Sequence, residues 1–138
     1  MPKRRRKLLL RQLTRLEIPT VLVDFDRVDL SNLQRQIAHT SDRIGWPKTS
    51  SARETLRALN PEIRIRCIEQ QLDPDELQRE VTLASLVLDC SDNFATRFAV
   101  NAACHRARVP LVSGAAGATG DLDDRLRHAL GRAKVRAE

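Results

Sequence analysis

Residues 21–36 read VLVDFDRVDLSNLQRQ and combine a short apolar run with a polar segment that starts at two closely spaced acids. The run at 21–25 is rich in branched residues and is preceded by Pro19, which predicts a buried β-strand. Asp24 and Asp26 then fall at the carboxyl end of that strand. The polar, irregular residues 26–47 predict a long loop after it.

Strands and helices alternate along the rest of the chain. Strands are predicted at residues 63–68, 85–90 and 109–113. Helices are predicted over 8–16, from about 48 to the Asn60-Pro61 pair, from the capping Asp73 and Pro74 onward, and over 94–106 with Asp92 as the cap. This alternation predicts an α/β fold with a doubly wound, mainly parallel sheet.

Composition is that of a single compact domain. A chain of 138 residues with 41% hydrophobic and 3% aromatic residues can bury one core made mainly of Leu, Val, Ile and Ala. We expect a basic arm with a short helix at 1–19, a nucleotide-binding core at 20–120, and a charged tail at 121–138 that fits either a helix or a frayed end. No apolar run approaches the roughly 20 residues of a membrane span, so no membrane association is expected.

The cysteine content favours a reducing compartment. The three cysteines show no CxxC spacing, so neither a disulfide framework nor a zinc site is predicted, and we expect a cytoplasmic protein. Burial in the fold is expected for Cys67, Cys90 and Cys104. His39, His105 and His128 lack partners at metal-ligand spacing and are expected to be surface or packed imidazoles.

The positive charge is concentrated at one end. The net charge is +6, but residues 1–15 carry seven Lys/Arg and no acid, which leaves 17 basic against 18 acidic residues elsewhere. Such an arm can contact phosphates without sequence preference. It shows no aromatic interleaving or recognition motif, so nucleic-acid binding is not expected, and a solvated terminus is the simpler interpretation.

Polar residues collect where strands of the predicted sheet end. In open parallel sheets ligands bind beyond the carboxyl ends of the strands. Asp24 and Asp26 follow one strand, Asp89, Asp92 and Asn93 another, and the glycine-rich residues 114–120 a third. An acid at such a position can accept hydrogen bonds from ribose, and a second acid can hold Mg²⁺. Each acid also fits a helix cap or a turn, and the glycine run also has the spacing of a dinucleotide loop, although no acid follows it at the required distance.

Five ordered blocks resemble one family. DFDRVDLSNLQRQ at 24–36 is similar to the DxDxVxxSNLxRQ run of ThiF/MoeB/HesA proteins and ubiquitin-activating enzymes. The other blocks are GWPK at 45–48 with AR at 52–53, LNP at 59–61, LDCSDN at 88–93 and VPLVSGAA at 109–116. The resemblance covers roughly residues 20–120.

The resemblance implies an incomplete Rossmann-like fold and an adenylating activity. ATP is expected to be attacked by the C-terminal glycine of a ubiquitin-like sulfur-carrier protein of the molybdopterin or thiamine type, giving an acyl-adenylate and pyrophosphate. The expected cofactors are ATP and Mg²⁺, and the expected catalytic groups are Arg35, Lys48 and Asp92. The implied ATP site has Asp24 on the ribose, Asn32 and Arg35 on the phosphates, Lys48 neutralising phosphate charge, Asp92 as the Mg²⁺ ligand, and Ser31 and Asn93 beside them.

Some parts of the family pattern lack a counterpart. The family places a GxGGxG-type loop ahead of the strand that ends at Asp24, whereas the first glycine here is Gly45. The family's zinc-binding CxxC pairs are also absent. We therefore expect a chain truncated at both ends, with an uncovered strand at 21–25 that favours self-association or a homodimer. Two functions stay open: an adenylyltransferase, and a non-catalytic remnant that only binds nucleotide, carrier or a partner subunit.

Overall fold

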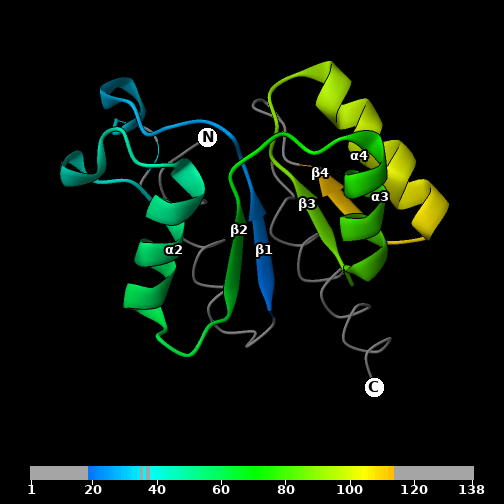
Figure 1. The fold of residues 1–138 in the computed structure, drawn as a ribbon, viewed down its shortest axis with the longest axis horizontal. Coiled ribbons are helices and arrows are strands. Elements are labelled where there is room, and N and C mark those ends of the chain that lie inside the picture. Colours follow the sequence, from blue (N-terminus) through cyan, green and yellow to red (C-terminus); the bar gives the residue numbers. More distant parts are fainter. Residues whose placement is uncertain (1–18, 35, 37, 114–138) are drawn as a thin grey trace. The chain divides into compact units, whose positions relative to one another are not determined.

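The computed structural model describes residues 19–34, 36 and 38–113 of the chain (Figure 1). The chain divides into two compact units, residues 1–71 and 72–138. Each unit has its own buried side chains, and each contains one pair of parallel strands. None of the helices within the described residues is long and apolar enough to cross a lipid bilayer.

Within its described residues, the first unit is built on two short parallel strands and one α-helix. Strand β1 (Thr20–Val23) pairs with β2 (Ile65–Ile68) in a register that places Thr20 opposite Ile65. Helix α2 (Lys48–Leu59) connects them and packs on β2, as Figure 1 shows. It ends at Asn60, whose extended backbone (φ −147°) is what the following proline requires. Leu56 and Ile63 are the buried apolar residues at this end of the unit.

The loop between β1 and α2 is held by a clasp of two segments, residues 26–28 and 45–48. Val28 N–H donates to the Trp46 carbonyl (2.8 Å), Gly45 N–H to the Val28 carbonyl (2.8 Å), and Lys48 N–H to the Asp26 carbonyl (2.9 Å). The Arg27 guanidinium adds a 2.8 Å bond to the Gly45 carbonyl. The two segments run antiparallel, and Val28, the last residue of the first segment, is buried. The loop is therefore not irregular at its two ends.

Two turns of 3₁₀ helix lie between the two clasp segments. They are η1 (Leu30–Asn32) and η2 (Ser41–Arg43). Asp29 caps η1 with its side chain, and Arg43 at the end of η2 donates to the Ser51 carbonyl and the Thr55 hydroxyl of α2. The loop thus packs onto α2 through hydrogen bonds.

The second unit places two helices on the other strand pair. Helix α3 (Pro74–Leu83) begins with the predicted Asp73 cap, which forms a reciprocal capping box with Glu76. Strands β3 (Val87–Asp89) and β4 (Leu111–Ser113) pair with each other in parallel. Helix α4 (Phe94–Ala107) connects them in the sequence. Helices α3 and α4 lie side by side (Figure 1), and Val81, Ala103 and Cys104 form the core between them.

The predicted fold class is confirmed. Helices alternate with parallel strands in the expected order, although each strand is shorter than its apolar run. The expected exposed apolar surface at the first strand is present, since Val21, Val23 and Phe25 are 42%, 47% and 63% exposed. The helix expected at 8–16 and the tail at 121–138 lie outside the described residues.

Two local predictions were wrong. Asn93, not Asp92, caps α4, because Asn93 has the extended backbone of a cap (φ −119°, ψ 146°) and its Oδ1 accepts the Thr96 amide at 2.8 Å. Cys90 is exposed rather than buried, because β3 ends one residue before it. Cys104 is buried as expected, and Cys67 is half-buried.

Gly45 should tolerate only residues that accept a left-handed backbone. Its φ is +87°, and a Cβ at this position would meet nothing within 4 Å, so any cost of substitution is conformational. We expect Gly45→Ala to lower the free energy of unfolding by about 1 kcal/mol in urea denaturation followed by circular dichroism. Gly45→Asn is the control and should cost less, because asparagine populates this region. Equal stability of the alanine variant and the parent chain would contradict the clasp geometry.

Candidate functional site

The carboxyl end of β1 brings two acids and a lysine together. Asp24 Oδ1 accepts the Asp26 amide at 2.9 Å, and Asp26 Oδ2 lies 3.4 Å from Lys48 Nζ. The Asp24 amide donates to the Ile68 carbonyl of β2, which holds Asp24 in line with the sheet. No donor to Asp24 Oδ2 is present among the residues that the structure describes, so that oxygen is available to a ligand hydroxyl.

Lys48 is the first residue of α2 and its side chain is only 15% exposed. The helix starts after Pro47 without a side-chain cap, so the positive end of its dipole and the ammonium charge occupy one region. In the first two turns, Thr49 Oγ1 and Arg53 Nε are buried without a hydrogen-bond partner within the described part of the chain. A positive helix end with unsatisfied donors is suited to an anion.

Ser31 and Asn32 are held in the 3₁₀ turn beside this group. Asn32 is 6% exposed, and its Oδ1 accepts the Asp29 amide at 3.0 Å. Ser31 is exposed, and its amide donates to Asp29 Oδ1 at 2.8 Å. Hydrogen bonds from the Ser31 hydroxyl and amide, with a smaller contribution from Lys48, lower the pKa of Asp29. With one lone pair of Oδ1 used by the Asp29 amide, Asn32 can offer its Nδ2 group to a ligand as a donor.

The contact between His39 and Ser51 was not predicted from the sequence motifs. The Nδ1 atom of His39 lies 2.8 Å from the hydroxyl of Ser51, which is fully buried on α2. Burial lowers the pKa of His39, the charges of Lys48 and Arg43 lower it further, and Asp24 acts in the opposite direction. His39 is therefore a packed imidazole, which is one of the two environments predicted for it. The sequence offered no spacing that pairs residues 39 and 51.

The second unit presents Asp92 and Asn93 after β3. Asp89, the last strand residue, is buried and accepts the Ser91 amide (2.9 Å) and hydroxyl (2.6 Å). The Asn93 side chain is used as the cap of α4. Asp92 is exposed, and its carboxylate forms no hydrogen bond or ion pair among the described residues, so it could hold a cation.

The structure does not bring all of the predicted site residues into one described site. Arg35 and the glycine-rich residues 114–120 lie outside the described residues. Asp24 and Lys48 belong to the first unit and Asp92 and Asn93 to the second, so one shared site stays a prediction. Among the described residues, no three His, Cys, Asp or Glu side chains are grouped to hold a metal ion.

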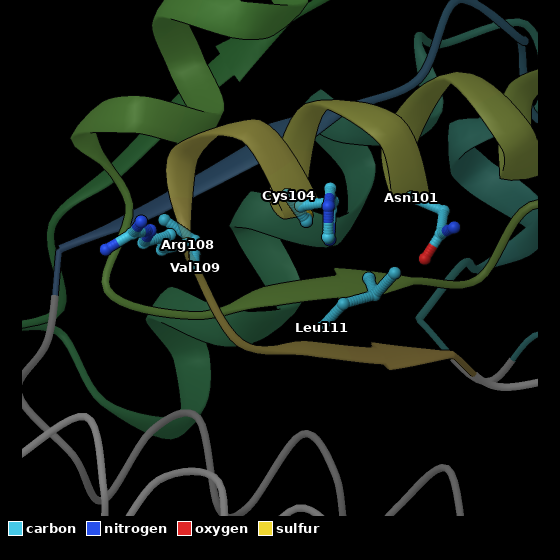
Figure 2. Close-up of a pocket in the computed structure, with 6 residues that line it drawn as sticks. Asn101, Cys104, Arg108, Val109 and Leu111 are labelled. Carbon is cyan, nitrogen blue, oxygen red and sulfur yellow. The ribbon is translucent and has the colours of Figure 1, made fainter.

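One cavity of about 450 Å³ lies between α4 and the start of β4 in the second unit (Figure 2). Its lining residues are Asn101, Cys104, His105, Arg108, Val109 and Leu111. Burial raises the pKa of the Cys104 thiol, and nearby Asp89 raises it further. A protonated, buried thiol is a packing group, and none of the predicted site residues that the structure describes lines this cavity.

Residues 8–126 match the family model described as the ThiF family. The chain belongs to the ThiF family. It is 52% identical over 95 residues to the molybdopterin-synthase adenylyltransferase of Escherichia coli (strain K12) and 45% identical over 96 residues to the sulfur carrier protein ThiS adenylyltransferase of the same strain. The matches cover 69% and 70% of this chain and 38% of each relative. This ThiF-family chain therefore spans well under half the length of these relatives.

Solved structures agree with this assignment. E. coli tRNA N6-threonylcarbamoyladenosine dehydratase, solved in complex with ATP, is 30% identical with a TM-score of 0.71, over 83% of this chain and 49% of that one. E. coli MccB, also solved with ATP, is 29% identical with a TM-score of 0.64, over 71% of this chain and 30% of that one. The ThiF-family fold is therefore supported by structure as well as by sequence.

Because burial lowers the pKa of His39 below its usual 6.5, the unfolded chain binds this proton more readily than the folded chain. We expect the free energy of unfolding to rise with pH through the folded-state pKa of His39 and to level off above 6.5. Urea denaturation between about pH 5 and pH 8 measures this slope. His39→Gln should reduce it, whereas His105→Gln, an exposed imidazole on α4, should leave it in place. A slope that survives His39→Gln unchanged would disprove the assignment.

Proposed function

We propose that the chain carries the side-chain half of an ATP site in an adenylating enzyme that activates a ubiquitin-like sulfur-carrier protein. The C-terminal glycine carboxylate of the carrier attacks the α-phosphorus of ATP and forms a carboxyl-phosphate bond. The bond to the bridging oxygen of the β-phosphate breaks, and pyrophosphate leaves with that electron pair. The observation that carries the proposal is the placement of Asp24 and Lys48 at one end of β1, joined through Asp26.

The first unit supplies groups suited to the ribose and the phosphates. Asp24 keeps one oxygen for ribose hydroxyls, because its other oxygen is held by the Asp26 amide. Lys48 brings an ammonium to the uncapped start of α2, and Asn32 and Ser31 contribute amide and hydroxyl donors from the neighbouring turn. We propose that Arg35, which follows this turn in the sequence, adds a second cation on the phosphates.

The second unit supplies the metal ligand in this proposal. Mg²⁺ in nucleotide sites is commonly held by one or two carboxylates together with phosphate oxygens and waters, and it neutralises phosphate charge. Asp92 fits this role, because the cap of α4 is provided by Asn93 and the Asp92 carboxylate is exposed. The Asn93 Oδ1 atom accepts the capping bond, and the amide nitrogen of the same side chain could donate to a nucleotide.

Electrostatics and positioning would dominate catalysis. Attack at the α-phosphate builds negative charge on nonbridging oxygens and on the departing pyrophosphate. Lys48 and Arg35 oppose that charge, and Asp24 holds the nucleotide by its ribose so that the phosphates reach them. No protein nucleophile is needed, because the carboxylate of the carrier is the nucleophile.

The carrier class follows the relatives, two of which are named for molybdopterin synthase and for ThiS. A cytoplasmic location and self-association remain parts of the proposal. Self-association is supported by the exposed Val21 and Val23 on β1, which has a strand partner on one side only within the described residues.

Mg²⁺-dependent ATP binding should depend on both units. Removing a charge-assisted contact typically weakens binding by about tenfold or more, so we expect Lys48→Ala and Asp92→Ala each to raise the Kd of Mg·ATP by about that factor in calorimetry. Asp75→Asn, an exposed acid in the first turn of α3, is the matched control and should bind like the parent chain. If the parent chain binds Mg·ATP but neither substitution changes its affinity, the site assignment fails.

The alternative function, a non-catalytic chain that only binds, is favoured by the lack of any glycine ahead of Gly45. A glycine loop supplies backbone N–H donors to phosphates, and each missing donor at a developing charge lowers a rate by roughly two to three orders of magnitude. We therefore expect carrier-dependent ATP–pyrophosphate exchange by this chain alone to be undetectable or very slow, while ATP binding persists. Rapid exchange would rule out the binding-only alternative and show that other residues replace the loop.

A further inference from the structure

Asp26 contacts both the backbone amide and the side-chain ammonium of Lys48. The Asp26 carbonyl accepts the Lys48 amide at 2.9 Å, and Asp26 Oδ2 lies 3.4 Å from Lys48 Nζ. The Asp26 amide in turn donates to Asp24 Oδ1 at 2.9 Å. One residue therefore joins the acid at the end of β1 to both the backbone and the ammonium of the first residue of α2.

We infer that Asp26 is a positioning residue that sets the place of the Lys48 ammonium relative to Asp24. Lysine carries a compact charge on a flexible four-carbon stem and loses much rotamer freedom when it is held in one place. The stem of Lys48 is largely buried, with 15% of the side chain exposed, so its ammonium emerges beside the Asp26 carboxylate. The carboxylate selects the rotamers that keep the charge at the strand end.

Direct ligand binding by Asp26 fits the geometry less well. One carboxylate oxygen faces Lys48, and the backbone amide and carbonyl are both used, by Asp24 and Lys48. A second carboxylate directed at a polyphosphate would also repel it. Asp26 thus acts through Lys48, and its effect should vanish when Lys48 is removed.

The expected effect is modest. The Asp26 side chain is 56% exposed, and ion pairs with an exposed partner are weak. Losing the charge should change ligand affinity by about threefold rather than by orders of magnitude. A threefold change still tests the inference, because the effect of changing Asp26 should depend on the presence of Lys48. A double-mutant cycle of the two residues measures that dependence directly.

The first test needs no ligand. In the full chain, the ¹³C signal of the Lys48 ε-methylene, assigned by its loss in Lys48→Ala, should move in Asp26→Asn and move less in Asp26→Glu. Glu54→Gln removes the same charge from an exposed position on α2 and should leave the signal in place. A Lys48 signal that is identical in Asp26→Asn and the parent chain would overturn the inference.

The second test rests on the proposed function. Asp26→Asn should weaken the binding of Mg·ATP by about threefold and leave the binding of adenosine unchanged, because adenosine lacks the phosphates proposed to meet Lys48. In the Lys48→Ala background the same substitution should have no further effect. Equal weakening of ATP and adenosine binding, or a full effect of Asp26→Asn without Lys48, would overturn the inference. Failure of the parent chain to bind ATP would count against the proposed function, while the ligand-free test would still decide the role of Asp26.

Discussion

The hydrogen-bonded clasp between residues 26–28 and 45–48 is the constraint on which the first unit depends. It closes a long polar loop with three hydrogen bonds between backbone groups and one from the Arg27 guanidinium, with donor–acceptor distances of 2.8 to 2.9 Å. Closing the loop places the start of α2 next to the end of β1, so Lys48 meets the acids that follow the strand. Gly45 permits this closure through its left-handed backbone. The clasp thus adds a direct link between the end of β1 and the start of α2 to the packing of α2 on β2.

The fold was predictable where local chemistry is strong. Asp73 and Pro74 define the start of α3, and the Asn60-Pro61 pair defines the end of α2, because caps and proline act through neighbouring atoms. Strand lengths were overestimated, because an apolar run continues beyond the residues that pair. The clasp could not be predicted from side-chain types, since it uses backbone groups about 18 residues apart. Gly45 was its only local indication.

The candidate site was also predictable only in part. Asp24, Lys48 and Asp92 were found from the motif and its position after strands, and the structure explains how two of them meet. The His39 contact with Ser51 escaped prediction because it depends on how the loop packs on α2. The cap of α4 was assigned one residue too early, because Asp92 and Asn93 are both good caps and only the backbone geometry separates them. That one-residue difference leaves the Asp92 carboxylate out of the cap.

Trp46 gives the clasp an optical consequence. It is the only tryptophan in a chain without tyrosine, and its carbonyl accepts one of the clasp bonds. The residue is 43% exposed, and the Arg43 guanidinium carbon lies 5.9 Å from the centroid of its ring. Intrinsic fluorescence excited near 295 nm therefore originates beside Lys48, in the first unit. Emission reports on the surroundings of the clasp, whereas helices of both units contribute to circular dichroism, so a fluorescence transition and a helical transition need not coincide.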